Sequence, residues 1–151
     1  MAATSATVHA SAVLMGARAV LIRGPSGAGQ SRLAFELIEA ARTRSLFARL
    51  VADDRVHLER FSGRLLVRPA EALAGLIEVR GVGIMRLAYE PRAVVALAVD
   101  LAAADGARIP QDKSRTTEIA GIALPRLPVA VNEAPLPPVL ALITSSAGPW
   151  I

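Results

Sequence analysis

Short apolar runs separated by turn residues make up most of the first third of the chain. The first run predicts a strand over residues 8–14, and a Gly16-Ala17 turn leads into a second strand over residues 18–23. Residues 31–44 instead carry apolar side chains at helical spacing. These positions are Leu33, Leu37, Ile38 and Ala41. The pattern predicts two strands, a loop and a helix in that order.

The remaining pattern predicts further short strands. A third strand over residues 46–52 is expected to end in Asp53-Asp54, and a hairpin to follow from residues 56–60 to 64–67 across a Ser62-Gly63 turn. The later expected elements are a short helical turn from Pro69, a strand over 76–80 broken by Gly81-Val82-Gly83, a buried central strand over 93–101, a loop over 102–110, a strand over 119–124 and a terminal helix over 137–146.

Length and composition favour one domain of the α/β class. The chain has 151 residues, within the usual size of a single domain. Hydrophobic residues make up 53% of it and aromatic residues only 3%. A core built mainly of Ala, Val, Leu and Ile suits a sheet that is buried on both faces.

Charge and cysteine content exclude several classes of protein. The absence of cysteine excludes disulfides and thiolate metal sites. No apolar run approaches the ~18 residues of a membrane span, and residues 1–7 do not resemble a signal peptide, so a cytoplasmic protein without membrane contact is expected. The net charge of +4 comes from scattered arginines and Lys113, the only lysine. That distribution argues against nucleic-acid binding and fits phosphate ligands or an acidic protein partner.

The clearest motif is a glycine-rich loop between the second strand and the helix. Its residues are Gly24, Pro25, Ser26, Gly27, Ala28, Gly29, Gln30 and Ser31. The phosphate-binding template G-x-x-x-x-G-K-[S/T] uses backbone N–H groups and the helix N-terminus to hold phosphate, and its Ser or Thr binds Mg²⁺. The strand–loop–helix context supports this interpretation over a glycine-rich turn that binds nothing.

Gln30 is the one departure from the template, which has lysine at that position. Losing a well-placed charged donor costs ~2–4 kcal/mol of transition-state stabilisation, roughly a hundredfold or more in rate. Three explanations are open: a weakened enzyme in which another cation supplies the charge, an inactive nucleotide-binding relative, or a simple change from a lysine codon. Arg32 is a poor substitute, because it lies about 100° further around the helix than Ser31. Lys113 is the better substitute through the family resemblance given below, which implies that the segment from Pro110 to Arg115 lies near the active site.

Other polar positions have both a catalytic and a structural interpretation. Asp53 and Asp54 follow a hydrophobic strand, where carboxylates bind Mg²⁺ or act as bases, although aspartates also end strands in turns. Residues 78–84 place alternate charges in an apolar strand and then two glycines, which also fits an edge strand with a bulge. His9 lies in an apolar strand and is either a catalytic group or a hydrogen-bonded core histidine.

Taken together, these segments resemble the catalytic domain of HPr kinase/phosphorylase, a bacterial enzyme that phosphorylates a serine of the phosphocarrier protein HPr. The ordered matches are His9-Ala10, the loop of residues 24–31, Leu50 to Asp54, and Glu78 to Ile84, which follows the signature E-[IV]-R-G-[LV]-G-I. A looser match is Ile109-Pro110 followed by Arg115. The resemblance spans about residues 8–125.

The resemblance implies a fold and a domain organisation. The fold is α/β and P-loop-containing, with a PEP-carboxykinase-like mixed sheet and flanking helices. Residues 1–151 would be a single HPr kinase/phosphorylase-type catalytic domain, of the short form typical of alphaproteobacteria that lacks a separate N-terminal domain. Longer members end in helices that help to form a hexamer, whereas residues 135–151 here are short and proline-rich. A homo-oligomer is therefore expected without a defined size.

The resemblance also implies ligands and roles. ATP would bind the loop of residues 24–31, and Mg²⁺ would bind Ser31 with Asp54 or Glu78. One of the Asp53-Asp54 pair would be the general base; the family pattern leans towards Asp54 as base or metal-linked residue. His9 would lie beside it and help to set its protonation state.

Two arginines complete the expected site. Arg80 and Arg115 would position the signature loop and the transferring phosphate. The implied activity is an ATP-dependent protein serine kinase, with a reverse phosphorylase reaction, acting on an HPr-like carrier of a phosphotransferase system that regulates carbon or nitrogen metabolism. The alternatives are a nucleotide-binding regulatory module without catalysis, because of Gln30, and a different P-loop kinase or NTPase.

Overall fold

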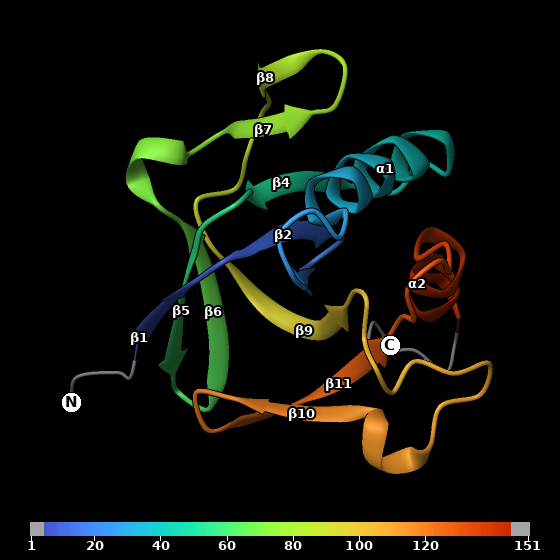
Figure 1. Ribbon diagram of the computed structural model, residues 1–151. Helices are drawn as coiled ribbons and strands as arrows, with labels where there is room; N and C mark the ends of the chain where they lie inside the picture. The colour runs from blue at the N-terminus through green and yellow to red at the C-terminus, as the bar shows by residue number, and fades with distance from the viewer. Residues whose placement is uncertain (1–4, 146–151) are drawn as a thin grey trace.

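A mixed sheet of nine strands organises the chain, and the computed structural model describes it over residues 5–145 (Figure 1). The strands are β1 (Ser5–Val8), β2 (Ala10–Met15), β3 (Arg18–Arg23), β4 (Ala48–Ala52), β5 (Val56–Phe61), β6 (Arg64–Pro69), β9 (Ala93–Asp100), β10 (Thr116–Ile119) and β11 (Ile122–Pro128). Their order is β1-β5-β6-β9-β3-β2-β4, with β11 beside β9 and β10 beside β11. Of these neighbours, β3, β9 and β11 run parallel.

Helices and a separate hairpin complete the fold. The helices are α1 (Gln30–Thr43) and α2 (Leu136–Thr144), with single turns at η1 (Glu71–Leu73) and η2 (Asp112–Ser114). A two-stranded hairpin of β7 (Leu76–Val79) and β8 (Gly83–Arg86) projects at one end (Figure 1). No helix within residues 5–145 is long and apolar enough to cross a membrane.

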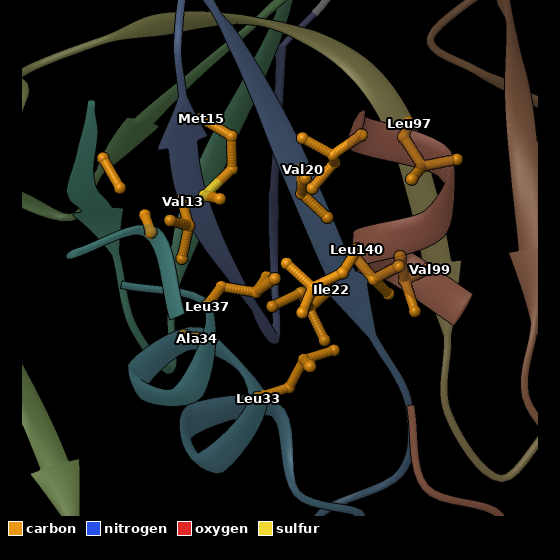
Figure 2. Close-up of a cluster of buried hydrophobic side chains, with 14 of the residues drawn as sticks. Val13, Met15, Val20, Ile22, Leu33, Ala34, Leu37, Leu97, Val99 and Leu140 are labelled. Atoms are coloured by element: carbon orange, nitrogen blue, oxygen red, sulfur yellow. The ribbon is translucent and has the colours of Figure 1, made fainter. Parts of the chain in front are cut away.

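The two faces of the sheet are buried by different means. On one face, α1 and α2 cover β2, β3 and β9, and Figure 2 shows Leu33 and Leu37 of α1 reaching towards Ile22. On the other face, the sheet curls so that residues of β5, β6 and the β10–β11 hairpin close over the small side chains of β2 and β3. The expectation of a sheet buried on both faces is confirmed.

Three expected elements need correction. The strand expected over residues 8–14 is broken at His9, because β1 pairs with β5 whereas β2 pairs with β3 and β4. The strand expected over residues 119–124 is wrong, since Ala120 and Gly121, with φ of 51° and 79°, form the turn between β10 and β11. Strand β8 was not expected. The terminal helix begins at Leu136, and Ser146, its expected end, lies outside the described residues.

A β-bulge between β2 and β4 resets which way the end of β4 faces. Ala12 pairs with Ala52 but Val13 pairs with Leu50, so Val51 is an extra residue on β4. Leu50 therefore packs on the α1 side while Val51 and Ala52 both pack on the opposite side. Because side chains alternate along a strand, the bulge turns the following residue, Asp53, to the α1 side.

The helical face of the core supplies a first prediction. Leu37 is fully buried in the cluster that joins α1 to the sheet. Leu37→Ala should lower the free energy of unfolding by about 2–5 kcal/mol, because it removes buried methyl groups and leaves a cavity. Urea unfolding measures this. Leu46→Ala is the matched control, since Leu46 is 38% exposed. Equal losses in the two variants would show that α1 is not anchored through Leu37.

Candidate active site

The sheet topology brings several strand ends to one edge. The parallel strands β3, β9 and β11 all end there, at Arg23, Asp100 and Pro128. Strand β2 is antiparallel to β3, so its first residues lie at the same edge, opposite Arg23. Strand β4 is antiparallel to β2 and ends there too. Segments distant in the sequence therefore surround the glycine-rich loop that follows β3.

The loop has a backbone that only glycine adopts easily. Gly24, Gly27 and Gly29 have φ of 155°, 82° and 104°. A side chain at Gly24 would also meet Leu101, because a Cβ there would lie 3.1 Å from both the Cβ and the carbonyl oxygen of Leu101. Among residues 5–145, the N–H groups of Ser26, Gly27 and Gly29 have no protein partner. These donors remain for a phosphate at the N-terminus of α1.

Gln30 folds back onto its own loop. The residue is 6% exposed, and its side-chain Nε2 donates to the carbonyl oxygens of Gly24 at 2.7 Å and Pro25 at 3.4 Å. The amide therefore holds the loop closed but brings no charge. Arg32 offers no substitute, since its guanidinium is 82% exposed and pairs with Glu36 on the outer side of α1.

Asp53 is the centre of a buried hydrogen-bond cluster. Asp53 is 4% exposed. The Ser31 hydroxyl donates to both carboxylate oxygens, at 2.7 and 2.9 Å, and the Ser11 hydroxyl donates to Oδ1 at 2.6 Å. The backbone N–H of Glu78 donates to Oδ2 at 3.2 Å. A buried carboxylate needs such donors, and here β2, α1 and β7 each supply one.

Asp54 lies in a different environment from its neighbour. Its side chain is 67% exposed, and its Oδ1 is 3.3 Å from Nε2 of His9, which is 38% exposed. The backbone at Asp54 is left-handed, with φ of 70°. His9 is therefore no core histidine, and the two consecutive aspartates are separated by their surroundings: one is buried against Ser31, the other open to solvent beside His9.

The other expected site residues are only partly gathered. Glu78 and Arg80 are exposed on the β7–β8 hairpin, and Glu78 joins the cluster through its backbone. Arg115 donates to the carbonyl oxygen of Pro110 at 3.1 Å and lies 3.8 Å from Asp112, and it makes no hydrogen bond or ion pair with the loop of residues 24–31. Lys113 is exposed in η2 and has no partner among the described residues.

A second charged cluster lies behind the loop and was not expected. Arg23 makes two hydrogen bonds to Asp100, at 2.7 and 2.9 Å. Arg126 also donates to Asp100 and makes two bonds to Asp105, at 2.7 and 3.1 Å. A backbone hydrogen bond joins the same two strand ends, since the Leu101 N–H donates to the Arg23 carbonyl oxygen. The residue just before the loop is thereby fixed to β9 and β11.

These contacts change the acidity of the aspartates. Burial alone would raise the pKa of Asp100, but hydrogen bonds and charge from Arg23 and Arg126 outweigh it, so the pKa is lowered. The hydrogen bond from Arg126, with another from Ser114, lowers the pKa of Asp105 to about 2. The hydrogen bond with Asp105, in turn, raises the pKa of Arg126. All three groups are held in their charged forms.

Sequence reasoning missed Ser11 and the second cluster. The only signal for Ser11 is a hydroxyl within the apolar run of residues 10–15. Arg23 is the last residue of one predicted strand and Asp100 lies within another, and nothing in the sequence indicates that β9 lies beside β3. Every buried side-chain polar atom in residues 5–145 has a hydrogen-bond partner, and no group of three or more His, Cys, Asp or Glu side chains that could by themselves hold a metal ion occurs there.

The fold and site define a mixed α/β domain with a glycine-rich loop between a strand and a helix, beside two strand-end aspartates. Residues 1–140 match the family of the HPr Serine kinase C-terminal domain. The chain belongs to that family, which confirms the resemblance found from the sequence.

Individual relatives agree. HPr kinase/phosphorylase of Streptococcus thermophilus is 44% identical over 80 residues, covering 52% of this chain and 24% of the relative. The Streptococcus pneumoniae enzyme of the same name is 36% identical over 124 residues, covering 75% of this chain and 38% of the relative. The chain thus matches only about a quarter to two fifths of these relatives' length.

A solved structure shows the same fold. The Hpr(Ser) kinase/phosphatase from Coxiella burnetii superposes with a TM-score of 0.69 at 26% identity, covering 89% of this chain and 91% of that chain. The expected α/β class, with a mixed sheet and flanking helices, is confirmed. The single-domain organisation over residues 1–151 and the short alphaproteobacterial form stay predictions.

The charged cluster gives a prediction for acid stability. The lowered pKa of Asp105, about 2, lies below the ~3.9 of an unfolded aspartate, so folding favours its ionised form. This contribution is complete above about pH 4 and is lost as the pH falls towards 2. Urea unfolding of the wild-type chain and Asp105→Asn at pH 5, 4, 3 and 2 should give a stability difference that shrinks across this window. A difference that stays constant down to pH 2 would contradict the interaction with Arg126.

Proposed function

We propose that this chain is the catalytic domain of an ATP-dependent protein serine kinase that acts on an HPr-like phosphocarrier. The observation that carries the proposal is that the two consecutive aspartates lie in different environments. Asp53 is buried against Ser31 at the start of α1, whereas Asp54 is exposed beside His9 at the same strand end. Phosphoryl transfer needs a phosphate cradle, a metal site and one base, and this edge of the sheet offers a residue for each.

The donor set fits Mg²⁺ bound together with nucleotide. Mg²⁺ takes oxygen ligands and is usually held by one or two protein groups plus phosphates. The Ser31 hydroxyl and the Asp53 carboxylate are such a pair, and Glu78 contributes an exposed carboxylate from β7. Bound there, Mg²⁺ neutralises charge on the phosphates. We therefore assign Asp53 and Ser31 as the primary metal residues, with Glu78 as an additional one.

Asp54 is the proposed base. Its carboxylate is open to a macromolecular substrate, whereas the Asp53 oxygens are already engaged by Ser11, Ser31 and the Glu78 N–H. Asp54 accepts the proton of the carrier's serine hydroxyl as that oxygen bonds to the γ-phosphorus and ADP leaves. In the phosphorylase reaction Asp54 accepts a proton from inorganic phosphate as a phosphate oxygen bonds to the phosphorus of the phosphoserine, and the serine oxygen leaves and is protonated. His9, at 3.3 Å, orients the Asp54 carboxylate.

The remaining roles follow the family resemblance. Arg80 is exposed next to the cluster and has no partner within the described residues, which supports a role in holding the transferring phosphate. Arg115 is held by Pro110 and has weaker support. A cytoplasmic location, a phosphotransferase-system carrier and a homo-oligomeric assembly belong to the same proposal through the family resemblance, and the names of the matched relatives, HPr kinase/phosphorylase, support the HPr-like carrier.

Gln30 favours a second candidate function. Its amide is bonded to the carbonyl oxygens of Gly24 and Pro25 and adds no positive charge, while the backbone donors that hold phosphate remain. A site of this kind keeps nucleotide binding and loses transition-state stabilisation. The second candidate is therefore a nucleotide-binding regulatory domain with little or no transfer.

A paired transfer assay separates the two candidates. Gln30→Lys should raise transfer of labelled γ-phosphate from ATP to an HPr-type protein roughly a hundredfold, because it restores a charged donor to the phosphates. Gln30→Met is the matched control and should give no gain. Transfer by the wild-type chain at a low rate supports the kinase. Nucleotide binding without transfer in the wild-type chain supports the regulatory domain, and no transfer in either form rejects the kinase proposal.

Substitution of the two aspartates tests their separate roles. Asp54→Asn should lower the rate of transfer at least ~100-fold while leaving the affinity for the metal–nucleotide complex within about threefold, because it removes only the base. Asp53→Asn should weaken metal–nucleotide affinity ~10-fold or more. Both are measured in the Gln30→Lys background so that turnover is readily detected. The reverse pattern would exchange the two roles.

A further inference from the structure

Ser11 is a fully buried polar residue that the mechanism above does not use. It lies in β2, is 0% exposed, and its hydroxyl donates to Oδ1 of Asp53 at 2.6 Å. Its neighbours along the strand, Ala10 and Ala12, are also fully buried. A hydroxyl placed in such a strand needs a buried acceptor, and Asp53 is the acceptor it has.

The strand register shows how the two residues come to face each other. Ala12 pairs with Ala52, so the next residues outward on the antiparallel strands, Ser11 and Asp53, lie side by side. Val13 packs on the α1 side, and by alternation Ser11 points to that side too. The bulge at Val51 turns Asp53 to the same side. Without the extra residue, Asp53 would face away from both Ser11 and Ser31.

We propose that Ser11 is a positioning residue that fixes the Asp53 carboxylate for the metal–nucleotide complex bound at Ser31. The inference rests on the proposed function, because it assigns Asp53 to the metal. Ser11 holds Oδ1 from the sheet, and the Glu78 N–H holds Oδ2 from β7. These two hydrogen bonds hold the carboxylate on both of its oxygens, so that it faces Ser31 in one orientation. Groups that orient a metal ligand in this way commonly contribute 10–100-fold to metal affinity.

Metal–nucleotide binding is the readout, since it does not depend on turnover. Mn²⁺ serves as the probe, and its free concentration is followed by electron paramagnetic resonance during titration of the full chain with a non-hydrolysable ATP analogue. Ser11→Ala should weaken Mn²⁺ binding about tenfold. Val13→Ala is the matched control: Val13 is equally buried two residues further along β2, packs in the hydrophobic core and has no polar side-chain atom to bond Asp53, so this variant should lose stability but keep its affinity.

An isosteric pair keeps the test decisive if Ser11→Ala does not fold. Threonine and valine have the same shape, but only threonine keeps the hydroxyl. Ser11→Thr should bind Mn²⁺ within about threefold of the wild-type chain, and Ser11→Val should be about tenfold weaker. Affinities that are equal in these two variants would overturn the proposal, because the hydroxyl would then have no effect on the metal.

A double substitution tests whether Ser11 acts through Asp53. In the Asp53→Asn background, Ser11→Ala should change Mn²⁺ affinity by less than about twofold, because residues that act as one unit are not additive. Full additivity would overturn the positioning role. A wild-type chain that binds no Mn²⁺ with the analogue would overturn the proposed function together with this inference. Binding by the wild-type chain that Ser11→Ala leaves unchanged would overturn this inference alone.

Discussion

The carboxylate of Asp53 is buried at the edge of the sheet, and it requires hydrogen-bond donors from whatever surrounds it. Those donors come from Ser11 in β2, Ser31 at the start of α1 and the backbone of Glu78 in β7. One charged group therefore fixes the relative position of the sheet, the helix that follows the glycine-rich loop and the signature hairpin. Burying this carboxylate would cost free energy if any of the three elements failed to supply its donor.

A second, half-buried anion, Asp100, lies beside Arg23, the residue that precedes the same loop. Asp100 is shared by Arg23 and Arg126, so the carboxyl ends of the parallel strands β3, β9 and β11 are held in register by charge as well as by backbone bonds. Gly24 follows Arg23 directly and packs against Leu101, which follows Asp100. The loop thus starts from a residue that is bonded to β9, and its curvature follows from the positive φ angles of Gly24, Gly27 and Gly29.

Membership of the HPr serine kinase C-terminal domain family gives this scaffold a chemical context, and Gln30 gives it a distinctive charge balance. The template places a lysine ammonium where this chain has an amide that bonds to the carbonyl oxygens of Gly24 and Pro25. The amide preserves the shape of the loop. Binding, which depends largely on backbone donors, and transfer, which depends on charge that develops in the transition state, therefore respond differently to this residue.

Local pattern alone determined much of this protein. The glycine-rich loop, its flanking strand and helix, the hairpin over residues 56–67 and the family itself follow from short-range spacing, because turns and helices depend on neighbouring residues. Spacing could not find the break at His9 or the Ala120-Gly121 turn, which depend on where strands find partners. Nor could it separate Asp53 from Asp54. The two aspartates are distinguished by the bulge at Val51, which exists only when β4 pairs with β2. The bulge turns the Asp53 carboxylate inward, whereas the Asp54 carboxylate stays in solvent.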